Sequence, residues 1–216
     1  MINTIIFDMD GVIAKAEIQH AKADQKALNE LNINCSIEYL LTTKGIPSKE
    51  VFEKILIEKK IKTDLNKLSD KKQEYLLEFI KKEIKPIIGA KELIQRVHNA
   101  GFKICVGSSA RRKEINLILE SLNLIQYFNS ITSVDDVAFG KPDPSIFLKA
   151  AKKENTLPEN CLVIEDSQYG IEAAKRAGMK CIGFKAKGNE HDLSQADLVV
   201  NDLKKITIEK IKKLGN

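Results

Sequence analysis

The chain has 216 residues, a formal net charge of +5 at pH 7 and a globular composition of 43% hydrophobic and 30% charged residues. This length allows one domain with an insert and a substantial core. No run approaches the roughly 18 consecutive apolar residues that a membrane helix needs. Residues 1–3 lead into an apolar strand without a charged leader, so we expect neither a membrane span nor a signal peptide.

The positive charge alone does not indicate a nucleic-acid partner. Lysines alternate with apolar and acidic residues, aromatic residues are few and tryptophan is absent, which favours solvated helix faces over a base-stacking surface. The four cysteines form no Cys-x-x-Cys pair, and three of them lie in apolar runs. We therefore expect reduced, buried thiols in a cytoplasmic protein without a nucleic-acid or membrane partner.

The first predicted element is a strand over residues 4–7, and it runs into Asp8, Asp10 and Gly11. Alternate side chains share one face of an extended backbone, so both carboxylates point toward one spot. Neighbouring anions raise each other's cost of ionising, and a hard divalent cation is the simplest remedy. Gly11 allows the backbone to turn and to approach a ligand closely. The alternative interpretation is a plain turn, for which Asp-x-Asp-Gly is common.

Residues 14–85 show only helical periodicity, as in Val51, Phe52, Ile55 and Leu56. This pattern predicts a helical domain over residues 14–85, inserted after the first strand. Pro86 and Gly89 mark the return of the chain to the domain that contains the first strand.

The remainder of the chain alternates strands with helices. Gly101 and Gly178 follow two helical patterns where a left-handed cap is expected, and Ser167 is placed to cap the next helix. The fold class is therefore α/β, a Rossmann-like parallel sheet with helices on both faces, in a core domain of residues 1–13 and 86–216. The later strands are predicted over residues 103–106, 161–164, 181–184 and 198–200, with a further one ending at Ile131-Thr132.

Polar residues follow four of these strands. Ligands of open parallel sheets bind beyond the carboxyl ends of the strands, so these connections are expected to meet at one edge. Ordinary turn composition could explain polar residues after any one strand, but it explains less well why they follow four strands. The segments are Asp8 to Asp10, Gly107-Ser108-Ser109, Gly140-Lys141-Pro142-Asp143-Pro144 and Glu165-Asp166-Ser167.

Together these motifs resemble the haloacid dehalogenase superfamily of phosphohydrolases, over residues 4–184. The resemblance is strongest to the branch with a helical cap, which includes β-phosphoglucomutases, phosphoglycolate phosphatases and sugar-phosphate phosphatases. Asp-Met-Asp-Gly-Val, Gly-Lys-Pro-Asp-Pro and Ile-Glu-Asp-Ser-Gln-x-Gly-Ile form a specific combination in this order. The serine motif around Ser108 alone would be only a weak indication of this family.

The resemblance implies a role for each motif. Asp8 is the expected nucleophile, which forms an aspartyl-phosphate, and Asp10 the general acid and then base. Mg²⁺ is the expected cofactor, bound by Asp8, the main-chain carbonyl of Asp10, Asp166 and, directly or through water, Glu165. The phosphate is expected to contact Gly11, Ser108, Ser109 and Lys141, with Lys141 balancing the charge of Asp8.

Each role has a structural alternative: Lys141 as a loop lysine, the two serines as helix caps, and Glu165 and Asp166 as acids at a helix start. In the insert, the resemblance suggests substrate contacts, with solvated side chains as the alternative. The suggested residues are His20, Lys44, Lys49 and Lys72, and Arg111 after the serine motif offers further positive charge.

The function expected from these motifs is a Mg²⁺-dependent phosphatase for a small phosphorylated metabolite, such as a sugar or polyol phosphate. A β-phosphoglucomutase is the first alternative. Ala14, Lys15 and Ala16 replace the family's usual residues after the first motif, and the mutase's substrate-loop arginine has no clear counterpart, so we favour the phosphatase. A non-catalytic anion-binding protein is the second alternative. A monomer is expected, with a dimer as the other possibility.

Overall fold

The structure is a computed structural model that describes residues 1–43 and 46–215. The chain divides into a sheet unit, Met1–Lys15 with Lys85–Asn216, and a helical unit, Ala16–Ile84. The sequence interpretation drew these limits at residues 14 and 85.

The sheet unit contains six strands in the order β5-β4-β1-β6-β7-β8, and every neighbouring pair is parallel. The predicted α/β fold class is therefore confirmed. The first strand of the sequence, β1, lies in the interior of the sheet, where it pairs with β4 on one side and β6 on the other. The strands are β1 (Thr4–Phe7), β4 (Lys103–Gly107), β5 (Ser130–Thr132), β6 (Cys161–Glu165), β7 (Lys180–Phe184) and β8 (Leu198–Val200).

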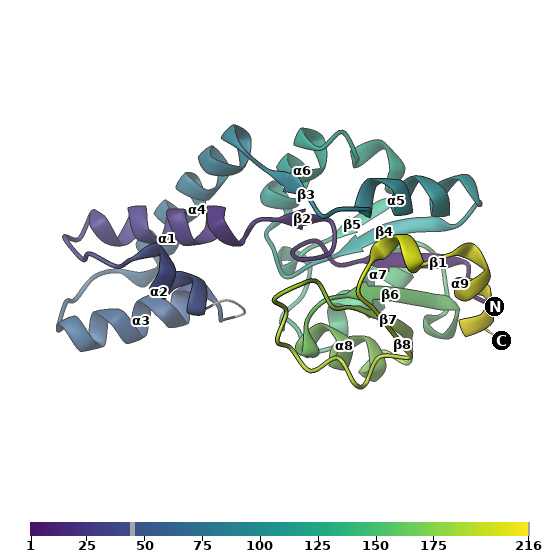
Figure 1. The fold of residues 1–216 in the computed structure, drawn as a ribbon. Helices are drawn as coiled ribbons and strands as arrows, with labels where there is room; N and C mark the ends of the chain where they lie inside the picture. The colour runs from purple at the N-terminus through teal and green to yellow at the C-terminus, as the bar shows by residue number, and fades with distance from the viewer. Residues whose placement is uncertain (44–45, 216) are drawn as a thin grey trace. The chain divides into compact units, whose positions relative to one another are not determined.

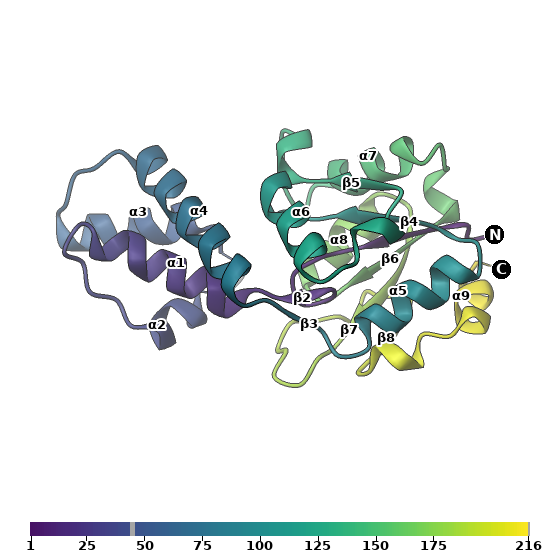
Figure 2. The same ribbon diagram turned by 90° about the horizontal axis from the view of Figure 1, so that it is seen from above.

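Helices cover both faces of this sheet, as Figures 1 and 2 show. Helices α5 (Ala90–Asn99) and α6 (Arg112–Ser121) lie over one face, and α7 (Ser145–Lys153) and α8 (Gln168–Arg176) over the other. The core beneath α7 and α8 contains Phe147, and its members are fully or almost fully buried. The remaining elements are α9 (Ile208–Leu214) and the short 3₁₀ helices η1 (Ile125–Tyr127), η2 (Val134–Asp136), η3 (Pro158–Asn160) and η4 (Leu203–Lys205).

The predicted helix ends follow from local chemistry. Gly101 and Gly178 have φ of +82° and +72°, a conformation that glycine adopts without a Cβ penalty. Ser167 directly precedes α8 as its N-cap, and its Oγ accepts a hydrogen bond from the Gly170 amide at 3.0 Å. These three predictions are confirmed.

Two very short strands stand where the chain leaves and re-enters the sheet unit. In this antiparallel pair of β2 (Ala14–Lys15) and β3 (Lys85–Pro86), Ala14 lies opposite Pro86 and Lys15 opposite Lys85. The sequence predicted only helical periodicity here, because a two-residue strand is too short to show an alternating pattern.

The helical unit consists of four helices within its described residues, 16–43 and 46–84. Asp64 caps α4 by accepting the Asn66 amide at 2.9 Å, and Phe52 and Leu76 are fully buried in the core of the unit. The helices are α1 (Glu17–Asn29), α2 (Ile37–Thr42), α3 (Ser48–Lys59) and α4 (Leu65–Lys82).

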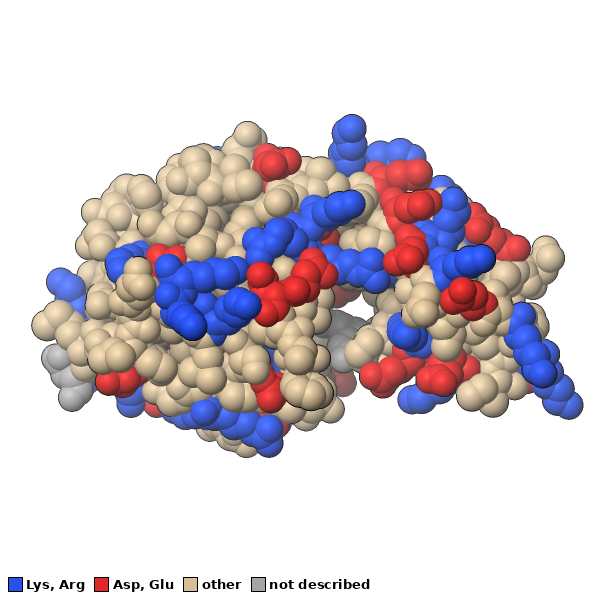
Figure 3. Space-filling model, turned by 180° about the vertical axis from the view of Figure 1, so that it is seen from behind, with Lys and Arg blue, Asp and Glu red and all other residues tan. Residues whose placement is uncertain are grey.

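Charged side chains of both signs share the surface of each unit. On the face drawn in Figure 3, basic side chains lie beside acidic ones. Lys175 pairs with Asp197 at 2.8 Å, for example. Among the described residues, no helix combines the length and the apolar character that crossing a membrane requires.

Candidate active site

The carboxyl ends of three central strands lie level with one another. Phe7 at the end of β1 is in register with Val106 of β4 and Ile164 of β6. The residues that follow these strands therefore emerge side by side at one edge of the sheet. The Asp8 amide continues the ladder by donating to the Ile164 carbonyl at 3.0 Å.

Three carboxylates meet at this edge around one lysine. Asp8, Glu165 and Asp166 are buried, and each offers an oxygen within 4.8 Å of the others. The Lys141 ammonium donates to Asp8 Oδ1 and, at 2.7 Å, to Glu165 Oε1. The structure thus brings together four of the residues that the sequence nominated from three separate motifs.

Burial sets the protonation of this cluster. It raises the pKa of the Asp8 carboxyl from its ordinary 3.8 to about 7, since the opposing effect of Lys141 is smaller and Glu165 adds to the rise. Burial alone would lower the pKa of Lys141, but Asp8 and Glu165 more than offset it and hold this pKa above its ordinary value. Lys141 therefore carries its charge, and Asp8 titrates near neutrality when no metal is bound.

Protein donors already occupy both oxygens of Glu165. Its Oε1 accepts from Lys141, and its Oε2 accepts from the Ser167 amide at 2.7 Å and from the Ser167 hydroxyl at 2.9 Å. A Cβ on Gly170 would lie 1.7 Å from Glu165 Oε1, so glycine leaves the space that this carboxylate fills. Glu165 therefore orients Lys141 and the start of α8, and its role as a metal ligand stays a prediction.

Lys141 is held at its position by the loop before α7. Asp143 Oδ1 accepts the Ser145 amide at 2.9 Å, which fixes the turn into the helix. The Lys141 ammonium also lies 4.8 Å from the centre of the Phe147 ring, a favourable cation–π contact.

Asp166 packs directly against the first motif. A Cβ on Gly11, whose φ is +82°, would lie 2.0 Å from Asp166 Oδ2, so only glycine permits this approach. The side-chain amide of Asn189 donates through Nδ2 to the main-chain carbonyl of Asp166 at 2.7 Å. Sequence reasoning missed Asn189, because a single asparagine in the loop after β7 has no pattern that marks it.

The two serines of the second motif differ in exposure. Ser108 is buried, its amide donates to the Thr132 carbonyl at 3.0 Å, and its Oγ accepts the Ala110 amide at 3.2 Å. Ser109 is exposed. Arg111 is exposed as well and directly precedes the first residue of α6. The contacts of Ser108 and Ser109 with phosphate, and of Arg111 with substrate, stay predictions.

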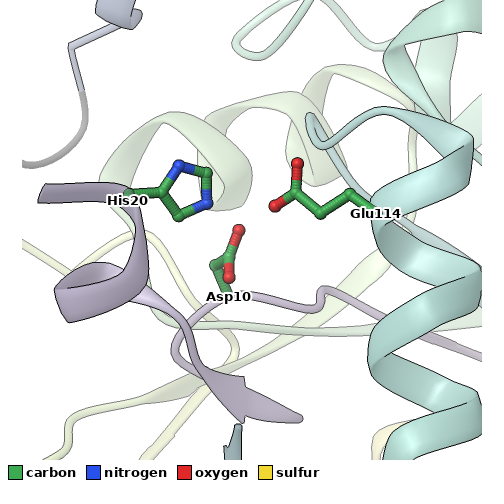
Figure 4. A group of neighbouring side chains, drawn as sticks. All are labelled: Asp10, His20 and Glu114. Atoms are coloured by element: carbon green, nitrogen blue, oxygen red, sulfur yellow. The ribbon is translucent and has the colours of Figure 1, made fainter. Parts of the chain in front are cut away.

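A further acidic side chain lies beside Asp10. Glu114, in the first turn of α6, is only 2% exposed, and one of its oxygens lies within 4.8 Å of one from Asp10. Figure 4 shows the two carboxylates directed toward each other. His20, which Figure 4 also labels, belongs to the helical unit. Sequence reasoning missed Glu114, because a glutamate in a first turn is expected simply to favour the helix dipole.

Two of the nominated residues of the helical unit contact each other. The Lys72 ammonium donates to His20 Nδ1 at 2.9 Å and lies 4.0 Å from Asp24 Oδ1. Burial raises the pKa of Asp24, with Lys72 opposing. Lys49 is exposed and donates to Asn66 Oδ1 at 3.0 Å. Lys44 lies outside the described residues.

Known proteins resemble this chain in sequence and fold. Beta-phosphoglucomutase of Bacillus subtilis is 32% identical over 217 residues, which cover 96% of this chain and 93% of the relative. Fructose-1-phosphate phosphatase YqaB of Escherichia coli is 28% identical over 178 residues, 82% of this chain and 94% of the relative. The crystal structure of beta-phosphoglucomutase from Clostridium difficile covers 100% of this chain and 98% of its own, with a TM-score of 0.82 and 30% identity.

The family match contains all of the motifs around Lys141. Residues 5–184 match the description of a haloacid dehalogenase-like hydrolase, and this range includes the buried carboxylates and Ser108. The chain is thus of the type that comprises phosphatases and phosphomutases. With most of its length inside the match, this protein belongs to the family of haloacid dehalogenase-like hydrolases.

Proposed function

We propose that this protein is a Mg²⁺-dependent phosphatase that hydrolyses a small phosphorylated metabolite, a sugar or polyol phosphate, through an aspartyl-phosphate on Asp8. The observation that carries the proposal is the buried contact of Lys141 with Asp8, next to Glu165 and Asp166. A nucleophilic carboxylate beside a fixed cation suits attack on a phosphoryl group, since charge neutralisation and positioning supply most of the catalysis.

The carboxylates of the cluster fit a magnesium ion. Three buried carboxylates within 4.8 Å of one another supply the oxygen ligands that Mg²⁺ prefers. Burial raises the pKa of Asp8 to about 7 despite the opposing effect of Lys141, so a bound cation would favour its ionised form. Asp8, Asp166 and the Asp10 carbonyl would hold the ion, with Glu165 directly or through water. When bound, it would supply positive charge to the phosphoryl oxygens and keep Asp8 ionised.

The side chains of the sheet unit then divide the reaction between them. An Asp8 oxygen attacks phosphorus as the phosphorus–ester oxygen bond breaks, and Asp10 donates a proton to the leaving oxygen. Asp10 next takes a proton from the water that attacks the aspartyl-phosphate, which releases phosphate and restores Asp8. Lys141 balances the charge throughout, while Ser108 and the amides that follow it, including that of Ser109, accommodate phosphate oxygens before α6, along with Gly11.

A β-phosphoglucomutase is the second candidate. It is supported by the relatives of that name at 32% and 30% identity over nearly the whole chain. It would use the same aspartyl-phosphate but return the phosphoryl group to another sugar hydroxyl. The helical unit would then supply the sugar contacts, with His20 and Lys72 as its candidates, together with Lys44 and Lys49 of that unit and with Arg111.

The test is phosphate release from an aryl phosphate with and without Mg²⁺. We expect turnover that requires the ion and that Asp8→Asn abolishes. Asp192→Asn is the matched control, since Asp192 is exposed and its Oδ1 accepts the amide of its close neighbour Ser194 at 2.9 Å, a contact that asparagine can keep.

Three other results would change the assignment. Turnover by Asp8→Asn would remove the proposed nucleophile. Conversion of β-glucose 1-phosphate to glucose 6-phosphate without net phosphate release would establish the mutase. Binding of phosphate esters without any Mg²⁺-dependent turnover, across sugar, polyol, nucleotide and glycolate phosphates, would favour a non-catalytic anion-binding protein.

A further inference from the structure

The serine motif after β4 is attached to the neighbouring connection of the sheet, the one that follows β5. The Ser108 amide donates to the Thr132 carbonyl at 3.0 Å, and the Ala110 carbonyl accepts the Val134 amide at 3.2 Å. Thr132 is the last residue of β5, and Val134 is the first residue of η2. Because the motif is bonded to this connection at two points, its position depends on the conformation of the chain between β5 and η2.

Asp136 fixes the conformation of that chain. Its Oδ2 accepts the Ser133 amide at 2.9 Å and the Ser133 hydroxyl at 3.1 Å, and the two residues form a reciprocal capping box around η2. A single 3₁₀ turn has little stability of its own. The side-chain bonds of Asp136 therefore determine where the turn places the partners of the serine motif.

The same carboxylate reaches the first residue of α6. The Arg112 guanidinium donates to Asp136 Oδ2 and, at 3.1 Å, to the Ile131 carbonyl, while the Arg112 amide donates to Asp135 Oδ2 at 2.8 Å. The side chains of the ion pair are 39% exposed at Arg112 and 20% at Asp136. An ion pair of this exposure contributes little to overall stability, but this one joins η2 to the start of the helix that follows the serine motif.

We propose that Asp136 is a positioning residue for phosphate: by holding η2 and Arg112 together, it keeps Ser108 and the amide that follows it where they contact the phosphoryl oxygens. This inference rests on the proposed phosphatase function and deepens it. In this role Asp136 acts through Ser133 and Arg112 and does not touch the substrate. Donors that are fixed in advance stabilise developing charge without reorganising, so a displacement of the motif weakens them together.

The first variant is Asp136→Ala, which removes the acceptor for both Ser133 and Arg112. We expect the inhibition constant of inorganic phosphate to rise about tenfold and kcat/KM for an aryl phosphate to fall by about the same factor, a smaller effect than the roughly 100-fold loss that a 1 Å displacement can cause. Asp136→Asn, which keeps an acceptor oxygen, should restore part of both values. The affinity for Mg²⁺, measured without substrate, should not change, because Asp8 and Asp166 follow β1 and β6.

Arg112→Met tests the route through the ion pair. It should raise the phosphate inhibition constant in the wild-type background and add little in the Asp136→Ala background, since both substitutions break the same contact. Lys153, whose ammonium lies 3.4 Å from Asp136 Oδ2, is kept in every variant. An equal effect of Arg112→Met in the two backgrounds would show that the two residues act independently and would overturn the inference. If Asp136→Ala does not fold, an unchanged phosphate constant in Arg112→Met would overturn it as well.

Asp202→Ala is the matched control. Asp202 caps η4 by accepting the Lys204 amide at 2.9 Å, and it follows β8, at the opposite edge of the sheet from β5; the phosphate constant should stay as in the wild type. A lower kcat for Asp136→Ala with unchanged KM and phosphate constant would indicate only a loss of folded enzyme, and would overturn the inference while leaving the phosphatase in place. Absence of Mg²⁺-dependent turnover by the wild type would instead overturn the proposed function, and the inference with it.

Discussion

Lys141 is the cation on which the buried carboxylates depend. Its ammonium contacts Asp8 and Glu165, and the side chain is 7% exposed. Lys141→Met keeps the length of the side chain but leaves the buried carboxylates of Asp8 and Glu165 without their cation. Because breaking a buried ion pair leaves an uncompensated charge, we expect a loss of about 3–5 kcal/mol in the free energy of unfolding near neutral pH.

Urea denaturation with and without Mg²⁺ checks this prediction, and the ion should restore part of the loss. Lys152→Met is the control, because Lys152 is an exposed lysine on α7. Equal stabilities of the two variants would show that the cluster does not need Lys141 for folding.

The raised pKa of Asp8 predicts a pH-dependent affinity for Mg²⁺. With a pKa of about 7 when no metal is bound, Asp8 is mostly protonated in mildly acidic solution. The cation binds the ionised form, so its apparent affinity should rise between about pH 6 and about pH 8, with proton release on binding.

Isothermal titration calorimetry in buffers of different ionisation enthalpy measures both quantities. Asp8→Asn should abolish the proton release. An affinity that stays constant over this pH range would contradict the raised pKa.

At the scale of single elements, helix α8 leaves room for the Glu165 carboxylate because Gly170 has no side chain. Alanine is normally better than glycine inside a helix, by about 1 kcal/mol. At Gly170, however, the new Cβ would lie 1.7 Å from Glu165 Oε1, and Lys141 and Ser167 hold that carboxylate in place. The clash therefore dominates, and Gly170→Ala should displace Glu165 and, with it, Lys141.

We expect Gly170→Ala to lower kcat/KM on the order of 100-fold, since displacing a positioning group by about 1 Å has an effect of that size. Phosphate-release kinetics measure it. Gly140→Ala is the control, because no atom of the described residues beyond Gly140 and its two chain neighbours lies within 4 Å of the Cβ it would add. Similar activities of the two variants would show that Glu165 does not position Lys141.

The strands and helix ends that could be predicted are those with a strong local signal. The apolar run from Thr4 to Phe7 is followed directly by Asp8, and all four residues of the run are buried in β1. Gly101 and Gly178 mark left-handed helix ends. By contrast, β2 and β3 depend on pairing between residues 14–15 and 85–86, which no sequence window contains.

The site was predictable to the extent that a motif places residues at strand ends. Asp8, Lys141, Glu165 and Asp166 follow from this rule and lie together. Asn189 and Glu114 do not follow from it, because their significance comes from contacts with residues far away in the sequence.

At the scale of the whole molecule, the cysteines report on folding. Cys105, Cys161 and Cys181 are buried in the sheet unit, and burial raises the pKa of each thiol, to about 12 for Cys161. Cys35 of the helical unit is partly exposed. We therefore expect at most one thiol to react quickly with a disulfide reagent at about pH 8 in the native protein, and all four after unfolding.

Cys35→Ser should remove the rapid phase of this reaction. Spectrophotometric titration in native buffer and in urea counts the thiols. Rapid reaction of two or more thiols in the native protein would show that the sheet unit opens far more readily than its packing indicates.

The pairing of β2 with β3 determines how the insert is joined to the rest of the chain. Ala14 lies opposite Pro86, so the two points of attachment are neighbours, whatever lies between them. Since the entropy of closing a loop grows only slowly with its length, the sheet unit can accept inserts of many sizes at this place. A lineage can therefore exchange this segment for another without rebuilding the phosphoryl-transfer machinery, which makes the junction a natural point for recombination.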